Sequence, residues 1–220
     1  MIGESKMKKI LLIGDSIRMG YDKYVKEALA GEAEVYYPDE NSRFALYVLR
    51  YAHEWRDKTG CGDDVDAVHW NAGLWDCLEL FGDDPMTDIE FYERLIARVD
   101  KRLRMLFPGA RMIFATSTAV LEEKCSEIYK RHNAIIEKYN EAAKRALAGT
   151  DTLINDLYAL SAALPEEYHS DATHYNTDGG RREIGNRVLS YLCGELGISA
   201  EKVNLESFVP ENYSKDNIGF

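Results

Sequence analysis

Short apolar runs alternate along the chain with longer segments in which apolar residues recur every three to four positions. The short runs predict strands at 9–13, 33–37, 66–71, 111–115 and 152–156. The longer segments predict helices at 18–30, 43–57, 88–106 and 123–147. A last helix is expected to begin at Thr177 or Asp178, either of which can cap it, and to end at Gly197. Strands that alternate with helices are typical of a mostly parallel sheet, so the pattern predicts an α/β protein.

The chain has the size and apolar content of one domain. It contains 220 residues, of which 45% are hydrophobic, enough for a substantial core. We expect a single domain over residues 1–198 and a C-terminal tail over 199–220, whose composition is polar and irregular. Val203, Leu205, Phe208 and Val209 can let the tail pack on the domain. Two long connections, 72–87 and 157–177, follow predicted strands, and such loops commonly build the site of an open α/β sheet.

Charge and composition narrow the class of partner. The formal net charge is −11, and charges of both signs are interspersed along the predicted helices, which argues against a nucleic-acid partner. No segment approaches the length of a membrane span, and the apolar run at 10–13 is too short for a signal peptide. The four cysteines are scattered, without the spacing of a disulfide framework or a zinc site. We therefore expect a cytoplasmic protein that binds neither nucleic acid nor membrane.

The turn after the first predicted strand carries the first candidate for chemistry. The apolar run at 9–13 ends in Gly14, Asp15 and Ser16, which places a serine hydroxyl at the carboxyl end of a strand. A serine is a weak nucleophile until a base removes its proton. The hypothesis of a nucleophilic Ser16 therefore requires a histidine and an orienting carboxylate elsewhere in the chain.

One of the five histidines has the surroundings expected of that base. His53 and His132 fall in predicted helices and His69 in a predicted strand, where structural or surface roles are favoured. His174 lies in a polar connection just before the last helix, with Asp171 three residues ahead of it. That spacing lets Asp171 contact one imidazole nitrogen while the other faces a distant serine. His169 is the local competitor for this role.

The glycine-aspartate-serine turn and the D-x-x-H segment together resemble the SGNH or GDSL hydrolase family. The resemblance spans residues 9 to about 195. It implies a single-domain, three-layer α/β/α sandwich with a mostly parallel five-stranded sheet, a flavodoxin-like arrangement. It also implies that Ser16 is the nucleophile, that His174 acts as general base and then as acid, and that Asp171 orients His174.

The family's third block, GxND, departs from its usual form in this chain. The corresponding segment reads Asn71-Ala72-Gly73-Leu74-Trp75-Asp76, so that Trp75 stands where the family has its oxyanion-hole asparagine. Asn71, at the predicted end of the third strand, is the only amide in this loop and is our candidate for the side-chain donor. The Trp75 indole is the rival donor, or else forms a wall of the pocket.

The family's glycine block departs as well. Ser42 stands where the family often has glycine, and its backbone N–H can still complete an oxyanion hole with Ser16 N–H and Asn71. The alternative is that Asn41 or Ser42 caps the next helix. Arg18 and Arg43 each begin a predicted helix, and we expect both to be exposed.

The resemblance predicts a serine esterase that acts through an acyl-enzyme and needs no cofactor. A short-chain ester, favoured as an acetyl group on a carbohydrate, is the expected substrate, because Trp75, Phe81 and Tyr175 can stack on a sugar ring. Asp15 is a further candidate for substrate contact, although holding the turn is its more plausible role. Lysophospholipase or thioesterase activity on the same triad and a catalytically silent binding domain are the alternatives. Acidic residues such as Asp22, Asp63 and Asp83 are expected to be solvated, and no metal site is predicted.

Overall fold

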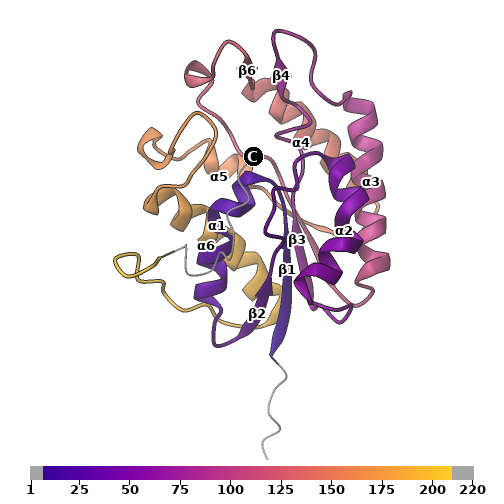
Figure 1. Ribbon diagram of the computed structural model, residues 1–220, viewed down its shortest axis with the longest axis vertical. Helices are drawn as coiled ribbons and strands as arrows, with labels where there is room; N and C mark the ends of the chain where they lie inside the picture. The colour runs from indigo at the N-terminus through magenta and orange to yellow at the C-terminus, as the bar shows by residue number, and fades with distance from the viewer. Residues whose placement is uncertain (1–6, 210–220) are drawn as a thin grey trace, which may run out of the picture.

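The computed structural model describes residues 7–209, and a five-stranded parallel sheet forms its centre (Figure 1). The strands are β1 (Lys8–Ile13), β2 (Ala33–Tyr36), β3 (Ala67–Trp70), β5 (Arg111–Ala115) and β7 (Leu153–Asn155). They lie in the order β2-β1-β3-β5-β7, with every pairing parallel. All four residues of β3 are buried, as expected of a strand covered on both faces. Each predicted strand is confirmed to within one residue at either end.

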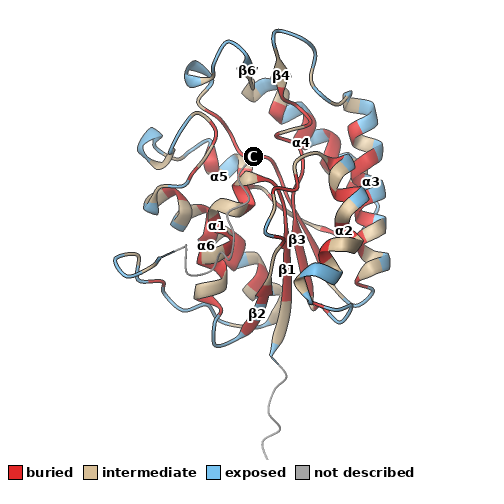
Figure 2. Cartoon of the chain, in the orientation of Figure 1, coloured by how far each residue is buried: buried red, intermediate tan, exposed pale blue. Residues whose placement is uncertain are grey.

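Helices cover both faces of this sheet. Helices α1 (Ser16–Ala28) and α6 (Asp178–Leu196) pack together on one face, and α2 (Ala45–Thr59), α3 (Ile89–Leu106) and α4 (Asn133–Leu147) form the layer on the other. Figure 2 shows their buried sides turned toward the sheet. The expected three-layer α/β/α sandwich is therefore confirmed.

The ends of the helices follow the expected local chemistry. Thr177 is the N-cap of α6, where its hydroxyl accepts a hydrogen bond from Gly180 N–H, and Gly197 ends the helix in the left-handed conformation. In α3 the predicted apolar stripe faces the core, with Tyr92, Leu95, Ile96, Val99 and Leu103 buried. These two helices begin and end where the sequence predicts.

The helix expected over 123–147 is wrong in its first ten residues. Helix α4 begins only at Asn133, whose N–H donates to the Glu122 carboxylate at 2.6 Å. Before it, a short 3₁₀ helix (Glu122–Lys124) leads to β6 (Tyr129–Lys130), which pairs antiparallel with β4 (Glu79–Leu80). Pairing with a segment fifty residues away overrides the local helical pattern here. A short helix, α5 (Leu157–Ser161), was not predicted.

The segment after Gly197 returns to the domain as far as Val209. Glu201 N–H donates to Ala28 O at the end of α1, and Val203 is buried. The ring of Phe208 lies edge-on to Tyr24 of α1, with their centroids 6.1 Å apart. Residues 210–220 of the expected tail lie outside the described residues.

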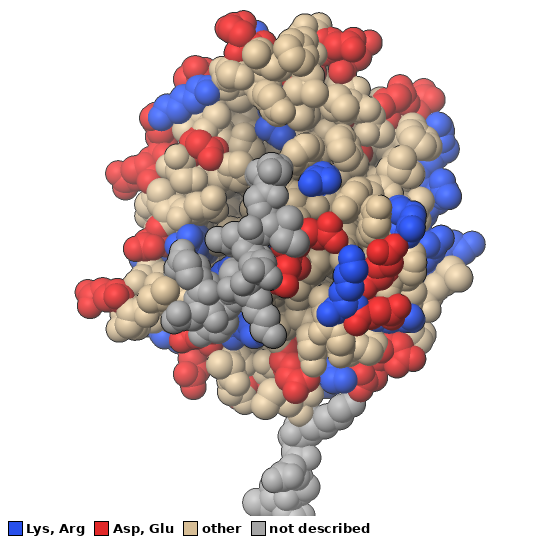
Figure 3. All heavy atoms as spheres, viewed as in Figure 1, with Lys and Arg blue, Asp and Glu red and all other residues tan. Residues whose placement is uncertain are grey.

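The surface carries charges of both signs. Figure 3 shows Asp and Glu side chains interspersed with Lys and Arg over the viewed face, without an extended region of either sign. No helix within residues 7–209 is both long enough and apolar enough to cross a membrane.

Candidate active site

The turn between β1 and α1 presents Ser16 as the first residue of a helix. Asp15 is the N-cap, and its Oδ1 accepts a hydrogen bond of 3.0 Å from Ile17 N–H. Gly14 is required by close packing, because a Cβ atom there would lie 1.9 Å from Asn71 Oδ1. The positive end of the α1 dipole therefore lies at Ser16, where an anion would be stabilised.

His174 and Asp171 complete a chain of hydrogen bonds to Ser16. His174 Nε2 lies 2.7 Å from Ser16 Oγ, and His174 Nδ1 lies 2.8 Å from Asp171 Oδ2. With the imidazole proton on Nδ1, His174 donates to Asp171 and accepts from the serine hydroxyl. The structure thus brings together the three residues that the sequence analysis chose, although 155 residues separate Ser16 from Asp171.

Asp171 is held by the backbone of its own turn. Its Oδ1 accepts from Thr173 N–H at 2.8 Å and from His174 N–H at 2.9 Å. Partial burial raises the pKa of Asp171, but these two backbone donors and the imidazole outweigh it, so the pKa falls below its usual value. The carboxylate is therefore ionised over the range in which His174 would act as a base.

The D-x-x-H turn is anchored to the segment that follows β5. Leu121 N–H donates to Ala172 O at 2.8 Å, and the Tyr175 hydroxyl donates to Ala119 O at 3.0 Å. Tyr175 is only 4% exposed, so the expectation that it contacts substrate is wrong; it packs beneath the turn. His169 stacks on Tyr175 at 4.0 Å between centroids, and burial lowers the pKa of His169. His169 is therefore a packing residue and not the partner of Ser16.

Asn71 leaves β3 directly beside the nucleophile turn. Its N–H donates to Ile13 O at 3.0 Å, and its side-chain oxygen lies against Gly14. Burial raises the pKa of Asp15, and the neighbouring Asn71 side chain opposes that effect. Asp15 is fully buried, so it holds the turn, and the alternative that it contacts substrate is wrong.

The loop at Ser42 does not offer the donor that we expected. Ser42 N–H donates to Gly14 O at 3.0 Å, so this N–H is already engaged, and the expectation for the oxyanion hole needs correction. Neither Asn41 nor Ser42 caps α2: Asn41 Oδ1 accepts from Arg43 N–H at 2.8 Å. Arg43 has a φ of 46°, a left-handed conformation that glycine adopts more easily. The bond from Ser42 instead fixes this loop against the nucleophile turn.

A buried ion pair beneath the turn was missed by the sequence analysis. Arg18 is 1% exposed and pairs with the buried Asp22, so the surface position expected for Arg18 and the solvated position expected for Asp22 are both wrong. Arg18 also donates to Glu40 O at 2.6 Å and to Gly14 O at 3.4 Å. Its guanidinium therefore ties the Ser42 loop to the turn that carries Ser16. The i,i+4 spacing of Arg18 and Asp22 is compatible with such a pair but equally with an exposed one.

Asp76, in the loop after β3, supplies the cap of α2. Its Oδ2 accepts from Ala45 N–H at 3.0 Å, and its Oδ1 accepts from the Thr87 hydroxyl at 2.9 Å. Burial raises the pKa of Asp76 to about 7 in spite of these donors. Trp75, beside it, is half-buried and lies edge-on to Phe44 with centroids 5.6 Å apart. Phe81, another aromatic proposed for substrate contact, is 79% exposed and directly follows β4, at the antiparallel pair that β4 forms with β6.

Arg131 is a second residue that sequence reasoning missed. It lies just before α4, and its Nε donates to Leu74 O at 2.6 Å while its Nη1 lies 3.4 Å from Thr173 Oγ1. These contacts place its guanidinium between the loop that follows Asn71 and the residue that precedes His174. A lone arginine near the start of a helix carries no sequence signal for such a position.

The remaining histidines lie apart from this chain of hydrogen bonds. His53 is in α2, as expected, whereas His132 is the N-cap of α4 rather than a residue within the helix. His69 is fully buried in β3, between the Tyr21 hydroxyl at 3.3 Å and Asn155 Nδ2 at 3.1 Å. Burial lowers the pKa of His69 to about 3, so it stays neutral in the fold.

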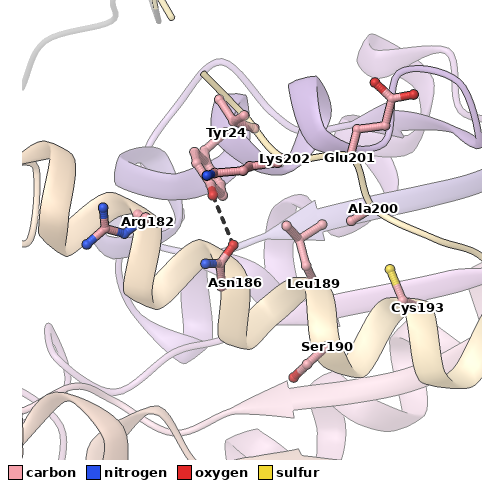
Figure 4. A pocket seen from close by; sticks show the side chains of 10 residues that line it. Tyr24, Arg182, Asn186, Leu189, Ser190, Cys193, Ala200, Glu201 and Lys202 are labelled. Carbon is pink, nitrogen blue, oxygen red and sulfur yellow. Dashed lines mark hydrogen bonds between the residues drawn. The ribbon is translucent and has the colours of Figure 1, made fainter. Parts of the chain in front are cut away.

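A separate pocket opens between α1 and α6, and neither Ser16, Asp171 nor His174 lines it. Its volume is about 440 Å³, and its walls include Tyr24, Asn186 and Cys193. Figure 4 shows these side chains from both helices beside Ala200 and Lys202, with the Tyr24 hydroxyl donating to Asn186. No histidine lines this pocket, so it has no counterpart of the contact between Ser16 and His174.

Searches against protein-family models and against curated protein sequences find no match. Solved structures do match. A lipase/acylhydrolase from Enterococcus faecalis is 18% identical, with 90% of this chain and 100% of that chain covered and a TM-score of 0.66. An acetyl xylan esterase is 17% identical, with coverages of 84% and 99% and a TM-score of 0.64. A GDSL-like lipase from Bacteroides thetaiotaomicron is 15% identical, with coverages of 87% and 89% and a TM-score of 0.62. The chain therefore has the SGNH/GDSL hydrolase fold.

Proposed function

We propose that this protein is a serine esterase that hydrolyses short-chain esters through Ser16, His174 and Asp171. The observation that carries the proposal is the continuous chain of contacts, 2.7 Å from Ser16 Oγ to His174 Nε2 and 2.8 Å from His174 Nδ1 to Asp171 Oδ2. Side chains at hydrogen-bond distance in this order are what an activated serine requires.

The reaction is an acyl transfer in two stages. Ser16 Oγ attacks the ester carbonyl while His174 Nε2 takes the hydroxyl proton, and the tetrahedral intermediate collapses as His174 returns that proton to the leaving alcohol. A water molecule, deprotonated by the same nitrogen, then attacks the acyl-enzyme and releases the acid. Asp171 stabilises the imidazolium that forms in each stage and holds its orientation.

The oxyanion is received by Ser16 N–H, at the start of α1, and by the Asn71 amide. Asn71 Oδ1 packs against Gly14 and the side chain hydrogen-bonds to the Asp15 carboxylate, so the amide lies within the same turn region as the nucleophile. Both are donors of the kind that stabilises an oxyanion. Because Ser42 N–H is bonded to Gly14 O, we leave it out of this set.

The substrate favoured by this proposal is an acetyl ester on a carbohydrate. One of the solved structures with this fold is named an acetyl xylan esterase. In this chain the half-buried Trp75, four residues after Asn71 in the same loop, offers an aromatic face of the kind on which a sugar ring can stack. The four unpaired cysteines are compatible with a reducing cytoplasm as the place of this reaction.

Hydrolysis of 4-nitrophenyl acetate and of acetylated xylo-oligosaccharides by the wild type and by Ser16→Ala tests the proposal. We expect the substitution to lower turnover by about ten-thousandfold or more, with an unchanged melting temperature. A fluorophosphonate probe should label the wild type at Ser16 alone. Turnover that survives Ser16→Ala would show that another residue carries the chemistry, and no turnover of any ester would favour a silent binding domain. Either result rejects the proposal.

An apolar groove favours a second candidate, hydrolysis of esters or thioesters with longer acyl chains. The groove runs between α2 and α3, has a volume of about 450 Å³ and includes Phe44, Tyr47, Phe91 and Leu95. Phe44 contacts Trp75, which connects the groove to the loop beside the site. A series of 4-nitrophenyl esters from two to twelve carbons separates the two candidates: rising kcat/KM with chain length, abolished by Leu46→Asp in the groove, would select the long-chain candidate.

A further inference from the structure

The position of Arg131 bears on which esters this site accepts. Its guanidinium reaches the β3 loop through Nε, which donates to Leu74 O at 2.6 Å. On its other side Nη1 lies 3.4 Å from the hydroxyl of Thr173, the residue before His174. Arg131 is half-buried, so part of its side chain remains open to solvent. A cation therefore lies between Leu74, in the loop that follows Asn71, and Thr173, the residue before His174.

The carboxylates around Arg131 do not neutralise it. Within residues 7–209 its guanidinium forms no ion pair with Asp or Glu, whereas Arg104, Arg111 and Arg145 elsewhere in the fold each do. Asp171 is engaged by His174. Burial raises the pKa of Asp15, and the Arg131 charge is near enough to oppose that effect. In a chain with a net charge of −11, a cation without a carboxylate partner at the site is available to a ligand.

We propose that Arg131 determines specificity by binding a carboxylate on the alcohol portion of the ester. This inference rests on the proposed esterase function. The guanidinium presents several donors in a planar fork, a geometry that matches a carboxylate. Nε contacts Leu74 O and Nη1 contacts the Thr173 hydroxyl. The N–H groups of Nη2 and the second N–H of Nη1 remain to bind the ligand.

The position of Thr173 indicates that Arg131 faces the alcohol portion of the ester and not the acyl portion. In the proposed reaction His174 Nε2 returns its proton to the leaving alcohol, so the alcohol departs on the side of His174. Thr173 is adjacent to His174 and in contact with Arg131. The class of substrate implied is an acetate ester of an alcohol that carries a carboxylate, such as an O-acetylated uronic acid.

Two matched pairs of chromogenic esters test this assignment. The first pair, 3-carboxy-4-nitrophenyl acetate and 4-nitrophenyl acetate, differs by a carboxylate on the leaving alcohol. The second, mono-4-nitrophenyl succinate and 4-nitrophenyl butyrate, differs by a carboxylate on the acyl group. Each is assayed with the wild type, Arg131→Met, Arg131→Lys and Arg145→Met. Arg145→Met is the control, because Arg145 lies on α4 and pairs with Glu93 away from the site.

We expect Arg131→Met to lower kcat/KM for the carboxylated acetate by about ten- to a hundredfold, mainly through KM, because a hydrogen-bonded charge is lost. The other three esters should change by less than about threefold, Arg131→Lys should have an intermediate effect, and 0.5 M NaCl should narrow the difference. An equal loss of kcat on both acetates would show that Arg131 only holds the loops, and no loss on either would show that it is not used. Both results overturn the proposal.

Binding of the products separates this inference from the esterase proposal. Calorimetry measures the affinity of 5-hydroxy-2-nitrobenzoate and of 4-nitrophenol for the wild type and for Arg131→Met, and it requires no turnover. We expect only the carboxylated product to lose affinity, by about tenfold or more. Should the wild type hydrolyse no ester, the esterase proposal fails, while this measurement still supports or rejects the carboxylate subsite: equal affinities for the two proteins reject it.

Discussion

Two histidines contact helix α1, one in a partly exposed loop and one in the buried core. His174 lies in a loop, 2.7 Å from Ser16 at the start of α1, with a carboxylate on its other nitrogen. His69 lies within β3, fully buried, 3.3 Å from the hydroxyl of Tyr21, also in α1, with an amide on its other nitrogen. In the first arrangement a carboxylate contacts the imidazole, whereas burial of the second imidazole keeps it neutral. Two features therefore distinguish the candidate base from the structural histidine. They are the group that contacts the second ring nitrogen and the exposure of the imidazole to water.

Replacing each histidine should give the largest contrast between the two regions. His174→Asn is expected to lower kcat by up to about a millionfold, because Ser16 loses its base, while the fold is retained. His69→Asn should keep kcat within about threefold when corrected for the folded fraction, since His69 touches no reacting atom. Turnover of 4-nitrophenyl acetate and circular dichroism measure the two effects. A severe loss of kcat in folded His69→Asn would show that the buried region takes part in the chemistry.

Asp171→Asn tests whether the carboxylate is what distinguishes His174. The amide can place an N–H toward His174 Nδ1, which favours the wrong tautomer, and an equivalent change in serine hydrolases lowers kcat by about ten-thousandfold. Because the ratio of the two neutral tautomers does not depend on pH, a loss caused by the wrong tautomer should stay constant across the alkaline range. The pH dependence of kcat between 6 and 10 is the measurement, and Asp178→Asn, at the exposed start of α6, is the matched control. Wild-type rates in Asp171→Asn would mean that His174 needs no orienting carboxylate.

The oxyanion side should show a smaller effect. Asn71→Ala is expected to lower kcat by about a hundred- to a thousandfold with little change in KM, because the amide acts only once charge develops. Trp75→Phe retains an aromatic ring and should change kcat by less than about threefold. Steady-state kinetics on one ester compare the two. If Trp75→Phe proved the more damaging, the indole would be the donor and Asn71 a packing residue.

The sequence predicts these regions unequally because some information is local and some is not. The G-D-S turn and the D-x-x-H turn are set by neighbours in the chain, and Asp171 reaches His174 within one turn, so Ser16, His174 and Asp171 were found together. The strands were found for the same reason, since each is a continuous buried run.

What the sequence did not predict depends on contacts between distant segments. Asp76 caps a helix that begins thirty-one residues earlier, and Arg131 reaches two loops that are each more than forty residues away in the chain. Ser42 N–H is engaged because its peptide group points toward Gly14 O. The identity of the side chain at position 42 does not reveal that direction. Arg18 has the spacing of an exposed helical residue, yet the loops around it close over its guanidinium.

The buried histidine also predicts how stability depends on pH, with Asp76 as its counterpart. The pKa of His69 falls to about 3 in the fold, below its ordinary value of 6.5, so His69 contributes stability that is complete above pH 6.5 and is lost as the pH falls toward 3. The pKa of Asp76 rises to about 7, above its ordinary value of 3.8, so Asp76 contributes stability below pH 4 that is lost as the pH rises toward 7. Between pH 4 and 6.5 the two effects have opposite signs, each with a slope of about 1.4 kcal/mol per pH unit, and they cancel.

Removing one group should therefore expose the slope of the other. Urea unfolding of the wild type, His69→Asn and Asp76→Asn at several pH values between 4 and 6.5 gives the free energies of unfolding. The difference between wild type and His69→Asn should grow as the pH rises, by about 1.4 kcal/mol per pH unit, and the difference for Asp76→Asn should change by the same amount in the opposite direction. A constant difference for His69→Asn would mean that the buried imidazole titrates normally, and the contrast with His174 would then rest on position alone.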